Sequence, residues 1–532
     1  MPPTAAFARR IRGCADRFRR LLDDPQASQA RALRAVLDRH AGCEYGRRHG
    51  FASIAGYDEF RRKVPIVTPD ELRASIDRMA AGEPGVLMSD PVVAFELTGG
   101  SSGGSKLVPH SATSLEAFRR ALFPWLDDLY GADPELGRGT AYWSISPAGR
   151  EDRCTAGGVP IGLESDAAYL GPELAAELVA TLSVPPAVGR VRDMEAWRQL
   201  TAYYLVADAN LSLISVWSPT FLLELLRYAE ENGARLAESV AAGEPGVKGA
   251  VDLRAQLPGR APDPQRARLV AAVLAERAPR FERLWPRLRL ISCWDQAASR
   301  PYAAEVRRRF PGVPVQGKGL LASEGVVSIP LSGHPLPVLT LESGFYEFLD
   351  ADGVPRLAHE VSSDGEYELL LTNHSGLYRY ALGDRVRVHG MAGRTPMLEF
   401  VGRGGLVSDL CGEKLTEEFV LRVLSRFGLR FATLAPHAPG ARGYVLLLDA
   451  AEVSETEAQA LAPRVDAGLE ADPQYAYARR LRQLAPLRAV RCAGPLASWI
   501  DDGLRRGQRL GDIKPCALYT HGDWQCRFQA VS

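Results

Sequence analysis

The sequence predicts an α/β protein with a large N-terminal domain and a small C-terminal α/β domain. Its 532 residues exceed the usual length of one domain, so two domains are expected. Strand-like apolar runs alternate with segments of helical apolar spacing, and this alternation is typical of layered α/β folds. Hydrophobic residues make up 46% of the chain and charged residues 24%, which provides enough apolar material for a sizeable core.

The first 80 residues are expected to be mainly helical. The segment "QASQARALRAVLDRHA" has apolar residues at helical spacing, and "TPDELRASIDRMAAG" opens with Thr68 and Pro69 and ends near Gly82. Those residues are typical of helix starts and ends. The N-terminus, "MPPTAAFARRIRGCADRFRRLLDD", lacks the apolar core of a signal peptide and carries three aspartates. We expect it to form a surface helix.

The middle of the chain predicts a parallel α/β layer. "PVVAFEL" is a predicted strand that leads into a glycine-rich loop, and "HSATSLEAFRRALFPWLDDLYG" is the helix expected after that loop. Further strands are predicted in "TAYWSIS", "ANLSLISVW", "PRLRLISCW" and "VPVQGKG", with helices such as "SPTFLLELLRYAEENG" between them.

The last third predicts an antiparallel sheet and then a separate small domain. Alternating patterns run from "SGFYEFLD" to "YRYALGDRVRVHG", and Arg403-Gly404-Gly405 follows as a flexible joint by composition. The predicted domains are residues 1–402 and 406–532, with a hinge at 403–405. In the second domain, "LRFATLAPH", "GYVLLLDA" and "PLRAVRCAG" are predicted strands, and "SETEAQALAPRVDAGLEA" and "LASWIDDGLRRG" are predicted helices.

Composition excludes several classes of protein. The formal net charge is +0, which argues against a dedicated nucleic-acid binder. No apolar run reaches the length of a membrane span. The eight cysteines form no C-x-x-C and the nine histidines no H-E-x-x-H, so neither a disulfide framework nor a zinc site is expected. A reducing cytoplasm is the expected compartment.

Lysine is scarce in this chain. Of 64 basic residues only six are lysines, which leaves 58 arginines. Because generic positive charge is supplied by arginine here, we expect the remaining lysines to be enriched at sites that need a compact charge on a flexible stem. They are Lys63, Lys106, Lys248, Lys318, Lys414 and Lys514.

The loop in "FELTGGSSGGSKLVPHS" has the composition of a phosphate-binding loop. It is not a Walker A loop, because counting from Gly100 places Ser105 at the second glycine and Leu107 at the magnesium-binding hydroxyl. A kinase-type glycine loop needs a strand on each side, and a helix is expected after this one. Hydroxyls, flexible glycines and Lys106 suit a triphosphate tail, and a flexible surface turn is the alternative.

The same loop resembles the T-S-G-T-T-G-x-P-K loop of the ANL adenylating superfamily, with its spacing preserved from Thr98 to Lys106. Gly99 replaces the second hydroxyl residue, and Ser105 replaces the proline. The resemblance implies that Lys106 is a catalytic cation. The residues that it implies for binding of ATP or AMP in this loop are Thr98, Gly99, Ser101 and Ser102.

"GLLASEG", residues 319–325, is similar to the aromatic-Gly-x-Thr-Glu motif of that superfamily. The similarity implies that Ser323 lies by the adenylate and that Glu324 binds magnesium. Leu320 stands where many relatives have Tyr, a partner for the adenine ring.

Two further motifs extend the resemblance toward the hinge. "YRYALGD" is similar to the motif whose aspartate holds the ribose hydroxyls, a role that falls to Asp384. "GRGGLVSDLCGEKL" resembles the hinge motif with its nucleotide-binding arginine, here Arg403. Gly405 replaces the charged residue that is usual at the hinge.

Several motifs narrow the resemblance to the auxin-responsive promoter (Gretchen Hagen) family of acyl-acid amido synthetases, in its bacterial form. They are "CEYGRRHGF", "FRRKVPIVTPDEL", "SGFYEFLD", "GLYRYALGDRVRV" and "GEKLTEE", and the resemblance runs from about Cys43 to Pro515. "GDIKP" resembles the family's Q-x-K-x-P segment, which implies that Lys514 is the catalytic lysine of the C-terminal domain. Asp512 replaces the glutamine there.

This resemblance implies an ATP-dependent enzyme that forms an acyl-adenylate from a carboxylic acid, releases pyrophosphate, and transfers the acyl group to an amine, often an amino acid. It also implies an ANL-like fold: doubly wound sheets and a small barrel-like sheet in the N-terminal domain, and a mobile C-terminal lid. The implied cofactors are ATP and Mg²⁺. The implied partners are the acid and the amine, with no nucleic acid and no membrane.

The chemistry of the residues agrees with that reading. A carboxylate resists nucleophiles until its oxygen is replaced by a better leaving group such as AMP, and the transition state gathers negative charge on phosphate oxygens. Magnesium on Glu324, with Lys106, Lys414 and Lys514, would supply the cations. An acyl-CoA ligase is the enzymatic alternative, and a non-catalytic nucleotide-binding regulator is the other.

Four residues at predicted strand ends complete the expectations. Trp143, Trp217 and Trp294 could line an acyl pocket, although tryptophans belong more often to the core. Lys318 precedes the adenine motif, and its expected role is to cap a strand.

Overall fold

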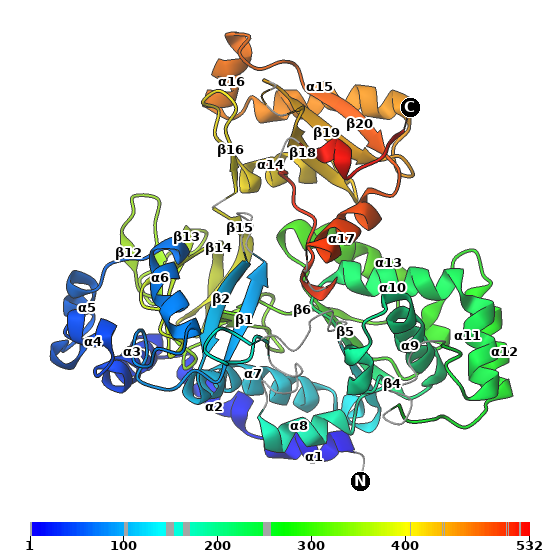
Figure 1. Cartoon of the computed structure of the whole chain (residues 1–532), viewed down its shortest axis with the longest axis horizontal. Helices are drawn as coiled ribbons and strands as arrows, with labels where there is room; N and C mark the ends of the chain where they lie inside the picture. The colour runs from blue at the N-terminus through cyan, green and yellow to red at the C-terminus, as the bar shows by residue number, and fades with distance from the viewer. Residues whose placement is uncertain are drawn as a thin grey trace.

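The computed structural model describes residues 3–99, 105–144, 154–162, 171–247, 257–404, 406–438, 440, 442–506, 508, 510–520 and 523–531. In Figure 1 most of the N-terminal helices and a long antiparallel sheet occupy one side, and a parallel sheet with most of its helices occupies the other. The C-terminal domain lies above both. None of the described helices is long and apolar enough to cross a membrane.

The N-terminal segment is helical, as predicted. The expected surface helix is two short helices separated by Gly13, and their inner faces bury Phe7 and Phe18. The predicted start at Thr68 is confirmed, because the Thr68 N–H donates to Glu71 Oε2 over 2.7 Å and closes a capping box. The six helices are α1 (Pro3–Arg10), α2 (Cys14–Leu21), α3 (Pro25–His40), α4 (Glu44–Arg48), α5 (Tyr57–Lys63) and α6 (Pro69–Ala80).

The helix expected over "HSATSLEAFRRALFPWLDDLYG" is present, but a strand that was not predicted separates it from the glycine loop. β1 (Ala94–Gly99) and β2 (Ser105–His110) form an antiparallel hairpin, and α7 (Ala112–Ala132) begins only after it. The run after the loop is too short for its pattern to separate a strand from a helix start, and pairing with β1 decides its conformation. The argument that excluded a kinase-type loop therefore fails on this point.

The predicted parallel sheet is present, with its strands in the order β3-β4-β5-β6. Residues 181–183 extend it on the far side of β3, because the Ala141 N–H donates to the Thr181 carbonyl and the Ser183 N–H donates to the Ala141 carbonyl, both over 2.9 Å. The spatial order is thus the 2-1-3-4-5 order of a doubly wound sheet, with its topological switch point between β3 and β4. The strands are β3 (Thr140–Trp143), β4 (Leu211–Ser215), β5 (Leu290–Cys293) and β6 (Val315–Gly317).

Helices cover this parallel sheet, and their apolar faces form its core. Trp197, Leu200, Ile214 and Phe221 belong to one buried cluster that joins the helices to the strands. The helices are α8 (Pro172–Val179), α9 (Met194–Ala207), α10 (Pro219–Glu231), α11 (Gly233–Ala242), α12 (Pro264–Leu274) and α13 (Arg300–Arg309).

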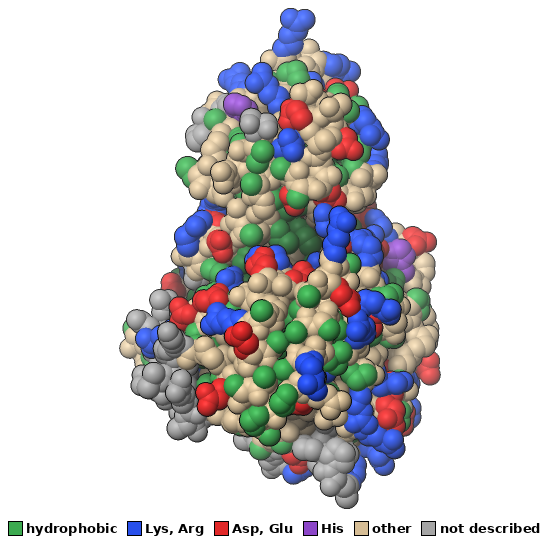
Figure 2. Space-filling view, turned by 90° about the vertical axis from the view of Figure 1, so that its right-hand side faces the viewer, with side chains coloured by type: hydrophobic (Ala, Val, Ile, Leu, Met, Phe, Trp, Pro, Cys, Tyr) green, Lys and Arg blue, Asp and Glu red, His purple; other side chains and the backbone are tan. Residues whose placement is uncertain are grey.

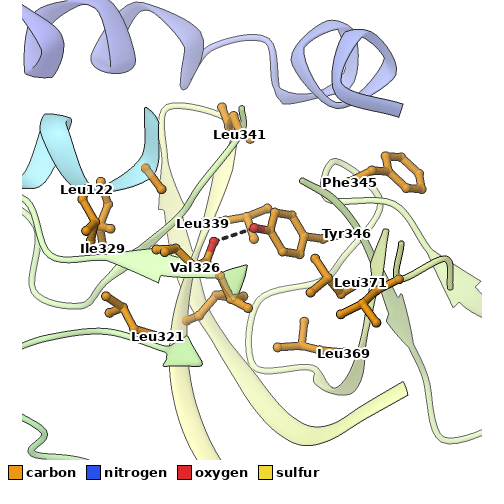
Figure 3. Packing of buried hydrophobic residues seen from close by; sticks show 14 of the residues in the cluster. Leu122, Leu321, Val326, Ile329, Leu339, Leu341, Phe345, Tyr346, Leu369 and Leu371 are labelled. Carbon is orange, nitrogen blue, oxygen red and sulfur yellow. Dashed lines mark hydrogen bonds between the residues drawn. The ribbon is translucent and has the colours of Figure 1, made fainter. Parts of the chain in front are cut away.

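The predicted antiparallel sheet has seven strands, in the order β12-β11-β13-β14-β15-β10-β9. The small hairpin of β7 (Leu321–Ala322) and β8 (Gly325–Val326) packs against its core (Figure 3). The seven strands are β9 (Ser328–Ile329), β10 (Val338–Leu339), β11 (Phe345–Leu349), β12 (Pro355–Arg356), β13 (Glu366–Thr372), β14 (Tyr380–Ala392) and β15 (Thr395–Arg403).

The C-terminal domain begins with β16 (Val407–Ser408) and has its own core around Leu434, Leu446 and Val465. Its sheet has the order β18-β19-β20-β21, and the strands and helices predicted for this region are all present. They follow β16 as β17 (Leu415–Thr416), α14 (Glu417–Leu424), β18 (Ala432–Pro436), β19 (Tyr444–Asp449), α15 (Glu455–Leu469), α16 (Pro473–Arg480), β20 (Arg488–Cys492), α17 (Pro495–Arg505) and β21 (Ala530–Val531).

Candidate active site

The hairpin β1–β2 sets the position of Lys106. Thr98 and Lys106 face each other in its register, so the two residues that begin and end the predicted phosphate loop are neighbours across the strands. Ser101 and Ser102 lie outside the described residues, as do Gly100 and the rest of the loop tip. The Lys106 side chain is half-buried, and its charge acts on Glu324 from across the site.

Ser323 and Glu324 form the turn of the β7–β8 hairpin, which the core holds in place. Tyr346 Oη donates to the Val326 carbonyl over 2.5 Å (Figure 3), and Thr340 Oγ1 donates to the same carbonyl over 2.6 Å. Asn373 Nδ2 donates to the Glu324 carbonyl over 2.6 Å. These bonds fix the backbone at Glu324 and just after the turn, and so orient the Glu324 carboxyl group.

Glu324 carries its carboxyl group in a charged environment. Burial raises the pKa of Glu324, while the positive charges of Arg403 and Lys106 act in the opposite direction. A bound cation would favour the ionised form in the same way. The structure therefore brings Glu324 and Lys106 together with Arg403, as the motifs predict.

Asp384 and Arg403 are register partners on β14 and β15. Arg403 Nε donates to Asp384 Oδ1 over 2.8 Å, and the Asp384 carboxylate raises the pKa of Arg403. The Asp384 side chain is only 2% exposed, whereas that of Arg403 is 41% exposed. Arg403 can therefore offer its outer N–H groups to an anion while Asp384 holds its inner edge.

Lys514 reaches the same region from the C-terminal domain. Its segment is tied to α14, because the Ala517 N–H donates to Glu417 Oε1 over 3.2 Å. Burial raises the pKa of Glu417, and the charges of Arg403 and Lys514 both oppose that rise. Lys514 Nζ lies 3.3 Å from the centroid of the Trp294 ring. Both cations thus act electrostatically on Glu417, a link that the sequence did not reveal.

Among the described residues, no hydrogen bond or ion pair joins Lys414 to this group. Its side chain is exposed at the turn between β16 and β17, with a left-handed backbone (φ 48°). The neighbouring Glu413 is buried and accepts the Tyr444 hydroxyl over 2.5 Å and the Leu410 N–H over 2.7 Å. Glu413 fixes this turn and with it the place of Lys414.

The three predicted pocket tryptophans converge at the carboxyl ends of the parallel strands. The ring centroids of Trp217 and Trp294 are 5.6 Å apart. Their backbones are also joined, because the backbone N–H of Trp294 donates to the Trp217 carbonyl over 2.9 Å. Trp143 packs edge-to-face against Trp125 of α7 at 6.4 Å. Lys318, expected to cap a strand, is instead buried among these rings. The scarcity of lysine in this chain was the only signal in the sequence for a special role of Lys318.

Behind the site lies a small cavity of about 10 Å³, lined among others by His110, Glu324 and His374. His374 and His40 are both buried, and His374 Nδ1 lies 3.2 Å from His40 Nε2. Burial lowers the pKa of His110, of His40 and of His374 to about 4 in each case. All three are therefore neutral at neutral pH.

We predict that acid destabilises the fold through these histidines. In the unfolded chain they take up protons as the pH falls through about 6.5, whereas in the folded chain they stay neutral down to about 4. Each therefore removes about 1.4 kcal/mol of stability per pH unit across that window. Thermal unfolding from pH 7.5 to 5 should show a falling midpoint, and His110→Gln should make the fall shallower.

The exposed His437 provides the control, because His437→Gln should leave the pH dependence unchanged. If wild type and His110→Gln gave parallel curves, burial of the neutral His110 ring would not be the cause of the acid sensitivity.

The chain is similar to known proteins over most of its length. The GH3 family N-terminal domain matches residues 14–315, and the GH3 family central domain matches residues 337–403. The chain is 25% identical over 464 residues to the probable indole-3-acetic acid-amido synthetase GH3.2 of Oryza sativa subsp. japonica, covering 80% of this chain and 73% of that protein. It is 26% identical over 447 residues to the indole-3-acetic acid-amido synthetase GH3.10 of Arabidopsis thaliana, covering 75% and 74%.

Solved structures share the fold. The GH3.15 acyl acid amido synthetase matches with a TM-score of 0.84 at 20% identity, covering 98% of this chain and 96% of that one. A 2-hydroxyisobutyryl-CoA ligase in the postadenylation state matches with a TM-score of 0.52 at 13% identity, covering 95% and 92%. At these identities the likeness concerns the fold.

Proposed function

The chain belongs to the GH3 family, and from that premise we propose that it is an ATP-dependent acyl-acid amido synthetase. It adenylates a carboxylic acid, releases pyrophosphate, and transfers the acyl group to an amine, for which an amino acid is the best candidate. The observation that carries the proposal is the convergence of Glu324, the Asp384–Arg403 pair and Lys106 with Lys514 from the other domain.

In the first step the acid carboxylate attacks the α-phosphate of ATP. Negative charge gathers on the phosphate oxygens, and cations fixed beforehand lower the barrier. Lys106 and the loop residues bind the phosphates, Asp384 accepts the ribose hydroxyls, and Ser323 lies by the adenylate. Lys514 brings its charge from the C-terminal domain, and Lys414 is a further cation of that domain.

The residues present fit a magnesium ion that is shared with ATP. Mg²⁺ is usually bound by one or two carboxylates together with substrate phosphates, and Glu324 provides one carboxylate beside the loop that bears Lys106. No group of three or more carboxylate, His or Cys ligands occurs among the described residues. When bound, the ion would neutralise phosphate charge.

The C-terminal domain acts as a lid that moves about residues 403–405, between domains of residues 1–402 and 406–532. β15 ends at Arg403, and the Gly404 N–H donates to the Gly383 carbonyl over 2.7 Å. Ile500, Leu510 and Ile513 of the C-terminal domain pack into the buried cluster that joins the parallel sheet to its helices. This small apolar contact, beside the hollow visible between the two parts in Figure 2, suits a lid that docks for adenylation and releases for aminolysis.

The proposal includes a cytoplasmic location for the protein. All eight cysteines are free thiols, including the buried Cys43, Cys293 and Cys492, which suits a reducing compartment.

The proposal predicts acid-dependent exchange of labelled pyrophosphate into ATP in the absence of any amine. Adenylation precedes aminolysis, so the right acid should support exchange alone, and AMP should then be released steadily with hydroxylamine or an amino acid but not with CoA. Amide formation should rise with pH toward the pKa of the amine, because only the unprotonated amine attacks.

A panel of carboxylic acids, each assayed with and without amines and CoA, tests this. Thioester formation faster than amide formation would favour an acyl-CoA ligase, and ATP binding without exchange for any acid would favour a non-catalytic regulator. Release of ADP and phosphate would indicate an acyl-phosphate intermediate instead.

A further inference from the structure

A cavity of about 670 Å³ lies outside the candidate active site. Its walls are α3, the chain between η1 (Phe51–Ser53) and α5, the start of β11, and the loop after β12. None of the described residues that the proposed function assigns to the reaction lines it. Its volume is within the range of roughly 300–1,000 Å³ that is usual for pockets of small molecules. We call it the α3 cavity.

The α3 cavity is long and has an apolar floor. Leu33 and Leu37 of α3 and Phe345 of β11 are buried and line it. Residues of α3 from Gln26 to Asp38 contribute to the lining, and that part of the helix extends over roughly 18 Å. The cavity therefore suits an elongated ligand with a mainly apolar body.

The rim of the α3 cavity carries an unbalanced positive charge. Arg34 and Asp38 form an ion pair with each other. Arg31 is exposed, its Nη2 donates to Ser28 Oγ over 3.0 Å, and no carboxylate within the described part of the chain pairs with it. The lining thus holds two arginines and one aspartate, a formal excess of one positive charge when histidine is counted as neutral. A single carboxylate on the ligand would complement this charge.

Gln29 joins the floor of the α3 cavity to the chain before and within β11. Its side chain is buried, and its Nε2 donates to the Leu341 carbonyl over 3.1 Å and to the Gly344 carbonyl over 2.9 Å. Its Oε1 accepts the Tyr346 N–H over 2.8 Å. A ligand that presses on this floor therefore acts on the backbone of β11.

Tyr346 continues the connection to the turn that carries Glu324. Neighbouring side chains of a strand point to opposite faces, so Phe345 lines the α3 cavity while Tyr346 is directed at Val326 (Figure 3). Tyr346 Oη donates to the Val326 carbonyl over 2.5 Å, and Val326 follows Glu324 by two positions. The cavity and the carboxylate proposed for magnesium are thus linked through one residue of β11.

We propose that the α3 cavity binds an N-acyl amino acid, the class of product that the proposed function forms, and that the bound product slows adenylation. For the identity of the ligand this inference rests on the proposed function. An N-acyl amino acid has an apolar acyl body and one carboxylate, which Arg31 binds at the rim. It is also longer than the acid from which it is made, which suits the length of the cavity.

Inhibition is the expected direction of the effect. Both N–H groups of the Gln29 amide donate and its oxygen accepts, so the link to β11 is fully bonded in this structure. Displacement of Gln29 or Phe345 by a ligand can therefore only loosen the link. A ligand that binds better to the loosened arrangement shifts the protein toward it, and the Glu324 turn is then held less firmly.

Photolabelling of the full-length protein locates the ligand. The probe is N-(4-benzoylbenzoyl)-L-alanine, an N-acyl amino acid whose benzophenone group attaches to neighbouring residues on irradiation. The label is expected on residues 26–38 or 54–57 of the wild type, and in Arg31→Glu it should fall about tenfold or more, because a hydrogen bond to a charged group is lost. N-benzoyl-L-alanine should protect these residues, whereas its uncharged methyl ester should protect them about tenfold less well.

Pyrophosphate exchange measures the effect on adenylation. With ATP and the acid both saturating, N-benzoyl-L-alanine should slow exchange by the wild type about fivefold or more, since substrates do not displace a ligand outside the reaction centre. Arg31→Glu should escape this inhibition and keep its uninhibited rate. Ala30→Trp, which places a large side chain in the cavity, should escape it as well.

Arg62→Glu is the matched control, because Arg62 is an exposed arginine of α5 that does not line the α3 cavity. It should keep both labelling and inhibition. Inhibition that saturating acid relieves, without label on residues 26–38, would overturn this inference and leave the proposed function standing. Protection by benzoate as strong as that by N-benzoyl-L-alanine would also overturn it, because the acid would then be the ligand.

Failure of the proposed function gives a different result. Exchange with no acid at all would overturn that function and with it the identity of the ligand, even where labelling still depends on Arg31. If Ala30→Trp does not fold, Arg31→Glu decides alone, because it alters an exposed side chain.

Discussion

Lys514→Ala is expected to lower acid-dependent pyrophosphate exchange by about 10²-fold or more, while ATP binding stays within about threefold of wild type. A 10²-fold loss corresponds to about 2.7 kcal/mol of transition-state stabilisation. The effect falls on the rate because the ammonium meets charge that develops only as the acyl–phosphate bond forms. Lys514 is exposed, lies against the Trp294 ring and, like Arg403, acts electrostatically on Glu417, so it can reach that charge from the lid.

Lys514→Ala should still convert a separately made acyl-adenylate and an amine into the amide, since the lysine serves the first step. Lys63→Ala removes an exposed lysine far along the chain and should leave both steps unchanged. Exchange at the wild-type rate in Lys514→Ala would show that another cation fills this role, and Lys414 would be the next candidate.

The strands of the parallel sheet could be predicted because each is a short apolar run between turn residues, as in Leu290–Cys293. The strand β2 could not, because its conformation depends on pairing with β1. Nor could the edge formed by residues 181–183, which joins the sheet through backbone bonds to Ala141. Contacts of this kind leave no periodic pattern in the sequence.

The candidate site likewise has parts that the sequence predicts and parts that it does not. Motifs place Glu324, Asp384 and Arg403 in one group, and the structure brings them together. The direct bond between Asp384 and Arg403 depends on the register of β14 and β15, which shifts at two irregularities between Arg385 and Met391. The aromatic surroundings of Lys318 combine α7 with the ends of β3 and β4, and the sequence contains no local signal for such a meeting.

Asp384→Ala is expected to raise the KM for ATP about tenfold or more and to abolish discrimination against 2′-deoxy-ATP. A hydrogen bond to a charged group contributes about 1.5–3 kcal/mol, and Asp384 is the buried acceptor proposed for the ribose hydroxyls. The fold should tolerate the change, because the Arg403 side chain is 41% exposed and water can solvate it after its partner is lost. Asp384→Asn should give an intermediate KM, since it keeps an acceptor oxygen without the charge.

Asp90→Ala is the matched control for Asp384→Ala. Arg39 Nε donates to Asp90 Oδ1 over 2.8 Å, the same distance as in the Arg403–Asp384 pair, and its aspartate is likewise the more buried partner, at 9% exposed against 55% for Arg39. Loss of a buried aspartate beside an exposed arginine is thus common to both variants, and only Asp384→Ala should change nucleotide selectivity. If 2′-deoxy-ATP were still discriminated in Asp384→Ala, Asp384 would serve only to orient Arg403, and the ribose would be held by other groups.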